Sequence, residues 1–205
     1  MSQDPLQRVL GRIRTAVAPG APGDARLLER FLAQRDEAAF AALLEGHGPM
    51  VLGVCRRVLA DEHAAEDVLQ ATFLLLARKA GSVRKRASVA SWLHGVALRL
   101  ARRAGADAAR SRRPDRRPRP AGSPDPLADL SGRELLGILD EELAALPERY
   151  RLPLVLCHLE GRARDEAAAL LGWSVGQVKG RLERGRSLLR DRLVRRGVSL
   201  SVALS

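Results

Sequence analysis

The chain has 205 residues, of which 46% are hydrophobic and only 3% are aromatic. This length suffices for one domain or two small ones with packed cores, and the scarcity of aromatic and β-branched runs excludes most β-rich architectures and favours an all-α fold. The formal net charge of +11 is typical of proteins that bind a polyanion such as DNA, RNA or an anionic membrane. A genome whose nucleotide composition favours arginine codons would produce the same excess of basic residues.

The amino-terminal half predicts an appended helix followed by a helical bundle. Residues 6–17 place apolar side chains on one stripe and a Pro/Gly stretch follows, so we expect residues 1–23 to form an extension. Residues 24–103 form the first expected domain, with helices at about 24–34, 36–59, 62–79 and 88–103. Gly46 and Pro49 could split the second of these helices.

The predicted helix at residues 62–79 has two different faces. One is an apolar stripe, made of Ala65, Val68, Leu69, Thr72, Phe73 and Leu76, and the other carries Glu66, Asp67 and Gln70. Such an acidic, amide-bearing patch is a poor surface for DNA and a good one for a basic protein partner. From these residues alone, an ordinary solvated helix face is the favoured explanation of the pattern.

Residues 84–103 combine basic and aromatic side chains. The basic ones are Arg84, Lys85, Arg86, Arg99, Arg102 and Arg103, and they flank Trp92 and His94. Phosphates can meet these charges while an unstacked base stacks on a ring, which suits single-stranded nucleic acid. The alternative places the Trp92 ring in the core. We favour the core for this ring and nucleic acid for the arginines.

Residues 104–130 change character, because they are dense in Arg and Pro and poor in large hydrophobic side chains. Such a segment cannot bury enough surface to fold alone, so we expect a flexible, basic linker between two helical domains. The second domain is expected at residues 131–195, and residues 196–205 form a tail without an evident role.

Residues 143–193 contain the pattern of a helix-turn-helix. The first helix is expected at 164–171, with carboxylates in its first turn, Gly172 at its end and Ser174 as the cap of the second helix. Val175, Val178, Leu182, Leu189 and Leu193 are predicted to face inward, and Gln177, Lys179, Arg181 and Arg184 to face outward. A cationic second helix fits the major groove of DNA, although an αα-hairpin occurs in many helical proteins.

Other chemistries find little support. Cys55 and Cys157 lie far apart and the histidines lack metal-ligand spacing, so we expect no metal and no cofactor. An enzyme acting on DNA would need a nucleophile, and the only tyrosine, Tyr150, reads as a packing residue. Without a signal-peptide core or a membrane span, the chain is expected in the cytoplasm.

Taken together, three segments resemble the extracytoplasmic-function (ECF) sigma factors of bacterial RNA polymerase. They are HGPMVLGVCRRVLADEHAAEDVLQATFLLLARKAG, then SWLHGVALRLARRA, and after the linker LPERYRLPLVLCHLEGRARDEAAALLGWSVGQVKGRL. The resemblance covers about residues 36–103 and 131–193. It implies that the first domain is sigma region two, that the second is region four, and that the chain selects promoters for transcription initiation without being an enzyme.

The resemblance also implies partners and site residues. Glu66, Asp67 and Gln70 would dock on the β′ clamp helices of core RNA polymerase, which also offers its β subunit. The segment at about 82–103 would capture and melt the minus-ten promoter element, through Arg84, Lys85, Arg86, Trp92, His94, Arg99, Arg102 and Arg103. The second helix of the helix-turn-helix would read the minus-thirty-five element through Ser174, Gln177, Lys179, Gly180, Arg181 and Arg184. An anti-sigma protein is a further candidate partner.

Two segments depart from the family pattern. The recognition segment commonly reads Thr-Val-Lys-Ser-Arg, and here it reads Gln-Val-Lys-Gly-Arg. Gly180 costs about 0.5 to 1 kcal/mol of helix stability relative to Ala and removes a hydroxyl group. Arg164 and Asp165 replace a common aromatic–acid pair. The remaining alternative is a helix-turn-helix repressor or activator that acts without polymerase, and we expect such a protein to dimerise on paired half-sites.

Overall fold

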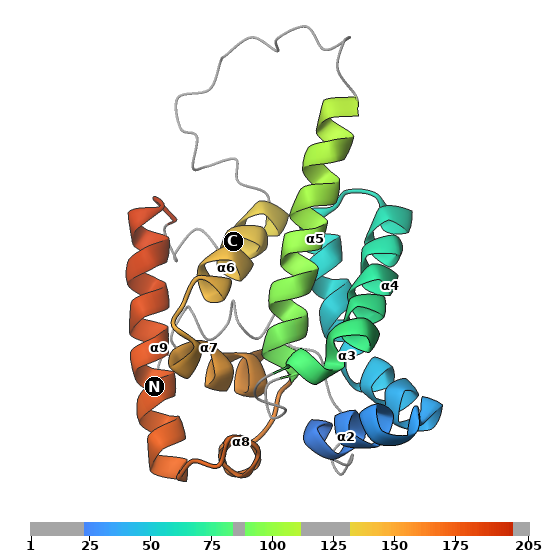
Figure 1. Ribbon diagram of the computed structural model, residues 1–205. Helices are drawn as coiled ribbons and strands as arrows, with labels where there is room; N and C mark the ends of the chain where they lie inside the picture. Colours follow the sequence, from blue (N-terminus) through green and yellow to red (C-terminus); the bar gives the residue numbers. More distant parts are fainter. Residues whose placement is uncertain (1–22, 84–88, 112–131, 199–205) are drawn as a thin grey trace, which may run out of the picture.

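The computed structural model describes residues 23–83, 89–111 and 132–198, and these residues form helices and short turns (Figure 1). The first half contains α2 (Asp24–Gln34), α3 (Glu37–Val58), α4 (Glu62–Lys79), the short 3₁₀ turn η1 (Ala80–Ser82) and α5 (Val89–Ser111). The second half contains α6 (Gly132–Ala144), α7 (Glu148–Leu154), the π-helical turn η3 (Val155–Leu159), α8 (Arg164–Leu171) and α9 (Val175–Arg195). The expected all-α class is confirmed. The extension at 1–22 and most of the predicted linker lie outside the described residues.

Aspartates begin two helices of the first half. Asp36 accepts a hydrogen bond from the Ala39 amide at 3.0 Å, and Asp61 accepts one from the Ala64 amide at 2.9 Å. Each bond satisfies an amide that the first helical turn leaves without a partner. The hydrogen bond from Ala39, supported by Arg30, holds the pKa of Asp36 below its ordinary value. These caps fix where α3 and α4 start.

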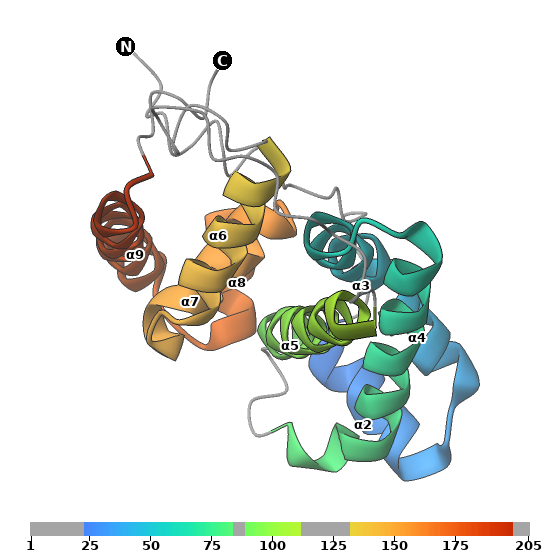
Figure 2. The ribbon, with the colours of Figure 1, turned by 90° about the horizontal axis from the view of Figure 1, so that it is seen from above.

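The central helix α3 runs without a break through Gly46 and Pro49. It packs against α2, α4, α5 and α6 (Figures 1 and 2). By length and composition alone α3 could cross a membrane, but its buried face, including Leu43, Val51 and Val54, contacts the neighbouring helices in the core. We therefore assign α3 as the core helix of a bundle.

Helix α5 is longer than the sequence pattern predicts. It continues to Ser111, eight residues beyond the expected end of the first domain. Apolar contacts support only part of this extension, since Ala101 is buried and Ala106 to Arg110 are exposed. The segment expected to be a linker therefore begins as a helix.

The two halves are packed against each other. α6 lies against α3 and α5, and η3 also contacts α5 (Figure 2). Buried apolar side chains from both halves, such as Leu98 of α5 and Leu139 of α6, belong to one continuous cluster. In this arrangement the two helical units are not separate bodies joined only by a tether.

Candidate nucleic-acid interface

Helices α8 and α9 form the predicted helix-turn-helix. Gly172 ends α8 in the left-handed conformation, with φ of 65°, which a glycine adopts without strain. At the start of α9, the Gln177 amide donates to Ser174 Oγ at 3.1 Å, and the Ser174 amide donates to Gln177 Oε1 at 3.0 Å. This reciprocal pair is a capping box, which fixes the first turn of α9.

The inner face of α9 packs as predicted, with one exception. Val178, Leu182, Leu189 and Leu193 are buried, and Ala167 and Ala168 of α8 are buried opposite them. Val175, predicted to face inward, is 49% exposed. It occupies the first position of the helix, before the chain has turned toward α8, so the prediction for Val175 was wrong.

The outer face of α9 carries the predicted site residues. Gln177, Lys179, Gly180 and Arg184 are exposed. Gln177 also serves the capping box, so its carbonyl oxygen is engaged while its amide hydrogens remain donors. These side chains line one face of the helix near its amino end.

Arg181 is held by a residue that the sequence reading did not include. Its guanidinium lies 3.7 Å from the centroid of the Trp173 ring, within the range of a cation–π contact. Trp173 lies in the turn between α8 and α9. Its position, a single aromatic residue directly before a cationic helix, is the sequence feature that could have indicated this contact. The stack orders Arg181 before any DNA is present.

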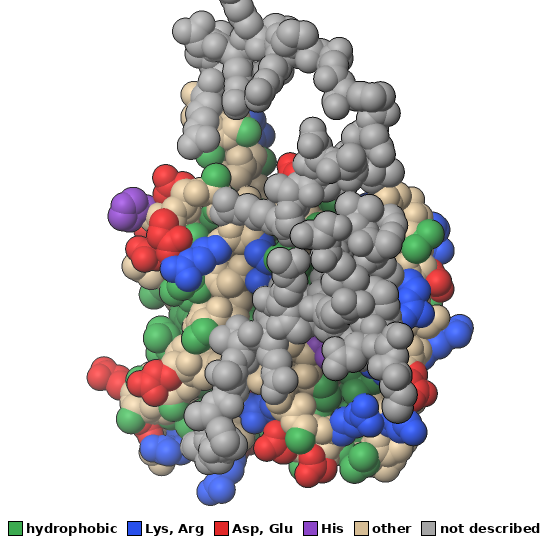
Figure 3. Space-filling view, turned by 180° about the vertical axis from the view of Figure 1, so that it is seen from behind, with side chains coloured by type: hydrophobic (Ala, Val, Ile, Leu, Met, Phe, Trp, Pro, Cys, Tyr) green, Lys and Arg blue, Asp and Glu red, His purple; other side chains and the backbone are tan. Residues whose placement is uncertain are grey.

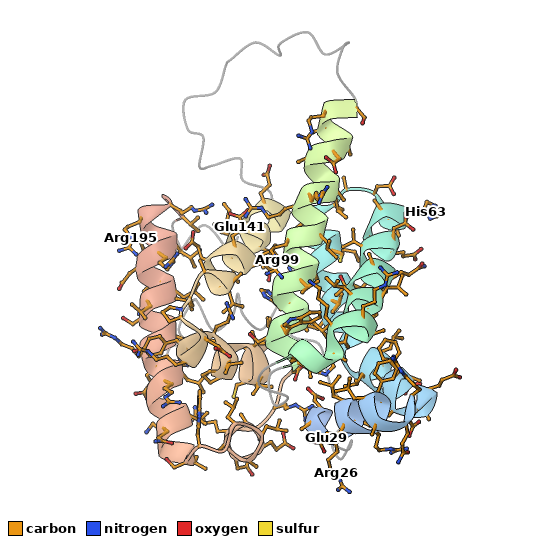
Figure 4. The ribbon with its side chains drawn as sticks, in the orientation of Figure 1. Arg26, Glu29, His63, Arg99, Glu141 and Arg195 are labelled. Atoms are coloured by element: carbon orange, nitrogen blue, oxygen red, sulfur yellow. The ribbon has the colours of Figure 1, made fainter. Side chains whose placement is uncertain are left out.

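The predicted minus-ten residues fall into three groups. Arg84, Lys85 and Arg86 lie outside the described residues. Arg99, Arg102 and Arg103 are exposed on α5, and Trp92 is half-buried against the core, as expected for its ring. Arg99 projects from the side of α5 that faces α6 (Figure 4). The structure thus brings Trp92, Arg99 and Arg102 to one surface, which we call the minus-ten face; these residues line a cavity together with α6 and α7.

His94 requires a correction. Its side chain is fully buried, and its Nε2 lies 3.0 Å from Asp140 Oδ1 of α6. A DNA contact by this side chain is impossible in this arrangement. The burial of His94 could not be predicted from its own helix, because its partner Asp140 lies 46 residues further along the chain.

The α4 patch, formed by Glu66, Asp67 and Gln70, is exposed on the side of α4 opposite its buried stripe. Neighbouring Glu62 pairs with Arg56 of α3. Figure 3 shows acidic side chains beside an exposed histidine on the edge where α4 lies. The patch remains available to a partner while α3 holds the helix that carries it.

Buried charged residues at the junction of the halves were not predicted at all. Asp140 accepts two hydrogen bonds from Arg57, at 2.6 and 3.1 Å, in addition to its contact with His94. His47 lies between Asp24, 3.0 Å from Nε2, and Glu160, 2.6 Å from Nδ1. Burial alone would lower the pKa of His47, but the two carboxylates outweigh burial and raise this pKa to about 10. His47 is therefore an imidazolium that links α3 to Asp24 of α2 and to Glu160 of the second half.

Two family models match the chain: "Sigma-70 region 2" over residues 43–112 and "Sigma-70, region 4" over residues 136–189. A helical bundle followed by a capped helix-turn-helix, matched in this order, defines a sigma factor of RNA polymerase. The second match coincides with the part of the chain that contains the helix-turn-helix.

Comparison with individual proteins shows to which family of sigma factors the chain belongs. The chain is 35% identical to the RNA polymerase sigma factor CarQ of Myxococcus xanthus, with 81% of the chain and 95% of CarQ covered. It is 31% identical to the ECF sigma factor SigE of Mycolicibacterium smegmatis, with 80% of the chain and 66% of SigE covered, and 27% identical to the ECF sigma factor SigW of Bacillus subtilis, with 77% and 90% covered. The chain belongs to the ECF sigma factor family and directs RNA polymerase in transcription initiation.

Among solved structures, CnrH in complex with the cytosolic domain of CnrY matches this chain at 25% sequence identity, with a TM-score of 0.40. The match covers 84% of this chain and 97% of that one. Family membership disfavours the alternative of a repressor or activator that works without polymerase.

Proposed function

We propose that three separate surfaces of this sigma factor divide the work of initiation. The α4 patch docks on the β′ clamp helices of core polymerase, the minus-ten face of α5 holds the melted strand, and the amino-terminal turns of α9 read the minus-thirty-five element. The observation that carries the proposal is the exposed cationic face of α9 above a capped turn, combined with an exposed acidic patch on α4 of an otherwise basic chain. We assign residues 24–103 to region two and residues 131–195 to region four, and we place the protein in the cytoplasm with its polymerase.

The role proposed for α9 follows from its chemistry. Lys179 and Arg184 can reach phosphates, which gives affinity that depends on salt. Arg181 can donate two parallel hydrogen bonds to a guanine edge, an interaction worth about 1–3 kcal/mol of discrimination. The stack on Trp173 lowers the entropy that Arg181 loses on binding, because the side chain is already ordered.

The docking role of the α4 patch follows from charge complementarity and from family membership, and a contact with the β subunit rests on family membership alone. A patch of two carboxylates and an amide can form charge-assisted hydrogen bonds with basic side chains of a large partner. An anti-sigma protein that restrains this chain stays a prediction. Any such partner would have to compete for one of the three surfaces.

Run-off transcription tests the function as a whole. Core polymerase with this chain on genomic DNA should initiate at a defined set of sites, which sequencing of the transcript starts identifies. If the chain neither associates with core polymerase nor changes start-site choice, the proposal fails.

The docking role of α4 predicts that Asp67→Lys combined with Gln70→Ala weakens binding to core polymerase by about tenfold or more, because a charge-complementary contact becomes repulsive. Binding is measured by fluorescence anisotropy of the labelled chain. The control is Asp191→Lys with Gln34→Ala, which makes the same two changes at exposed positions on α9 and α2. Equal affinity of the two double variants contradicts docking through α4.

The reading role of α9 predicts that Lys179→Ala combined with Arg181→Ala lowers promoter affinity of the holoenzyme by at least about tenfold, while core binding is unchanged. Lys179→Ala alone leaves the Trp173 stack intact and should show a smaller, sequence-independent loss. Arg26→Ala with Arg195→Ala removes two exposed charges elsewhere (Figure 4) and serves as the control. Loss of core binding in the α9 variant would mean that the second half had unfolded.

A further inference from the structure

The outer face of α9 carries one residue whose charge is opposite to that of its neighbours. Glu183 is exposed, and it lies in the sequence between the exposed cations Lys179 and Arg184. α9 lies at the edge of the described part of the molecule, with α6, α7 and α8 packed on one side of it (Figures 1 and 2). Glu183 therefore shares the open side of the helix with residues assigned to the minus-thirty-five element.

Helical geometry places Glu183 inside the proposed DNA contact. With 3.6 residues per turn, a residue four positions after Lys179 lies only about 40° further round the axis. With a rise of 1.5 Å per residue, Glu183 lies roughly 12 Å from the start of α9, which is about the width of the major groove. An orientation of α9 that brings both Lys179 and Arg184 to DNA therefore brings Glu183 there as well.

Gly180 leaves the space beside Glu183 open. Residues three positions apart are neighbours on the surface of a helix. A methyl group added at Gly180 would meet no atom within 4 Å, and the glycine itself places no side chain there. A base edge can therefore approach the backbone of α9 closely beside the Glu183 carboxylate.

The Glu183 carboxylate is also free to accept hydrogen bonds. Lys179 and Arg186 occupy positions of α9 from which an ion pair with Glu183 could form. In the described part of the chain, Glu183 pairs with neither of them. Its oxygens are therefore available to a partner outside the chain.

A carboxylate that meets DNA has few partners. It accepts hydrogen bonds and donates none, and phosphates repel it. In the major groove, the donors are the amino groups of cytosine and adenine, whereas guanine and thymine offer only acceptors. Adenine places its N7 acceptor beside the amino group, where it repels the second carboxylate oxygen. Cytosine has no acceptor there and is the base that suits a carboxylate best.

We propose that Glu183 is a specificity-determining residue of α9, whose carboxylate accepts a hydrogen bond from the N4 amino group of one cytosine in the minus-thirty-five element. This inference rests on the assignment of α9 to that element under the proposed function. It deepens that assignment by naming the base that one side chain reads. Any other base at this position leaves a desolvated carboxylate without a donor, so Glu183 selects by rejecting the alternatives.

The first experiment measures base preference with the complete holoenzyme. Core polymerase with the unmodified chain, Glu183→Ala or Glu183→Gln selects from a mapped promoter randomised over its minus-thirty-five element, and the bound DNA is sequenced. The unmodified chain should prefer cytosine at one position. Glu183→Ala should lower this preference about tenfold and leave the other positions unchanged. Glu183→Gln should prefer adenine there, because an amide pairs with both N6 and N7 of adenine.

The control variants make the same two changes at an exposed glutamate of α3. Glu45→Ala and Glu45→Gln remove the same charge far from α9 in the sequence and should retain every base preference. Unchanged preferences in either Glu183 variant overturn the inference. An equal loss of preference at every position also overturns it, because Glu183 would then act on the helix as a whole and not on one base.

The second experiment tests the exchange of one base by transcription. Two promoters differ only at the identified base pair, with cytosine or adenine on the strand that Glu183 reads. The unmodified holoenzyme should initiate about tenfold more often from the cytosine promoter, and the Glu183→Gln holoenzyme should reverse the order. A misfolded variant would lose activity on both promoters alike, so an unreversed order refutes reading by Glu183.

The two experiments also separate this inference from the proposed function. If the unmodified holoenzyme shows no base preference in the upstream element, the reading role of α9 fails as a whole. If the unmodified chain shows a preference that both Glu183 variants retain, only the cytosine contact of Glu183 is refuted.

Discussion

His47 joins three elements through the two nitrogens of its ring. The residue belongs to α3, Asp24 begins α2, and Glu160 follows η3 of the second half. The buried imidazolium is stabilised by both carboxylates, and the loss of His47 would leave Asp24 without this cation and Glu160 with only its contact to Arg162 at 3.2 Å. Sequence inspection had set the histidines aside for lack of metal-ligand spacing.

We predict that His47→Gln lowers the free energy of unfolding by about 3 kcal/mol, because Asp24 and Glu160 then lose their shared cation. Urea denaturation followed by circular dichroism measures this loss. His63→Gln changes a histidine whose side chain is 94% exposed and should alter stability by less than about 0.5 kcal/mol. A loss of the same small size for both variants would contradict the role of His47.

The same ion triplet predicts a dependence on pH. The pKa of His47 is raised from 6.5 to about 10 in the folded chain, so the folded state binds the proton more tightly than the unfolded state. The stabilisation is fully present below about pH 6.5 and is lost as the pH rises toward 10. The stability difference between the unmodified chain and His47→Gln should therefore shrink between pH 7 and pH 10. A constant difference over this range would show that His47 is uncharged in the folded state.

Features of the site that depend on neighbouring residues were predicted from the sequence, whereas contacts between residues far apart in the chain were not. The Ser174 cap, Gly172 and the exposure of Lys179 and Arg184 depend on neighbours in the sequence, and all were anticipated. The partners of His94 and Arg57 lie 46 and 83 residues away. No pattern within one helix could indicate them.

At the scale of elements, α9 contains two glycines in different surroundings. A methyl group added at Gly180 would meet no atom within 4 Å, whereas one at Gly185 would lie 3.0 Å from Leu154 Cδ1 and 3.3 Å from the Tyr150 carbonyl oxygen. Gly185 is thus the point where α7 approaches α9 closely. Gly180 has no such packing reason and only weakens its helix.

We predict that Gly180→Ala stabilises the chain by about 0.5 to 1 kcal/mol, because alanine loses less conformational entropy in a helix. Gly185→Ala, the matched change one and a half turns further along, should instead destabilise it, since the Tyr150 backbone must move. Thermal unfolding of both variants gives the comparison. Two shifts of the same sign would contradict this account of α9.

Helix boundaries show where sequence patterns fail. The starts at Asp24 and Glu62 and the whole of α8 agree with the prediction. One helix was expected at about 36–59, with Gly46 and Pro49 as a possible break; buried residues on either side of Pro49, including His47 and Met50, keep α3 packed and continuous. α5 was expected to stop at residue 103, because the periodic apolar signal fades there although alanines still favour helix.

At the scale of the whole molecule, composition predicted two tethered domains and could not show that they dock. An Arg/Pro-rich segment indicates that a region cannot fold alone, but it contains no information on the surfaces at its ends. Apolar side chains such as Leu135 and Leu139 of α6 belong to the cluster shared by both halves. In the sequence, the same residues are equally consistent with a core that belongs to the second domain alone. Docking is therefore a property that only three-dimensional placement reveals.

We predict that the unmodified chain unfolds in one cooperative transition in urea, because both halves share a core. Asp140→Ala should split this into two transitions and cost about 3–5 kcal/mol, since Arg57 keeps a buried charge without its carboxylate. Fluorescence and circular dichroism, recorded together, distinguish one step from two. Asp191→Ala, at an exposed position of α9, should keep the single transition, and a single transition in Asp140→Ala would contradict the shared core.

The pairing of Glu142 with Arg192 and Arg196 offsets part of the positive charge at the carboxyl end of α9, where Arg195 stays exposed. Lys179 and Arg184, closer to its amino end, are exposed, and the helix dipole adds a partial positive charge there. The electrostatic potential of this rod is therefore graded along its axis. Electrostatic attraction would therefore bring a DNA duplex first to the amino end of α9, and so orient the two molecules before any base is contacted.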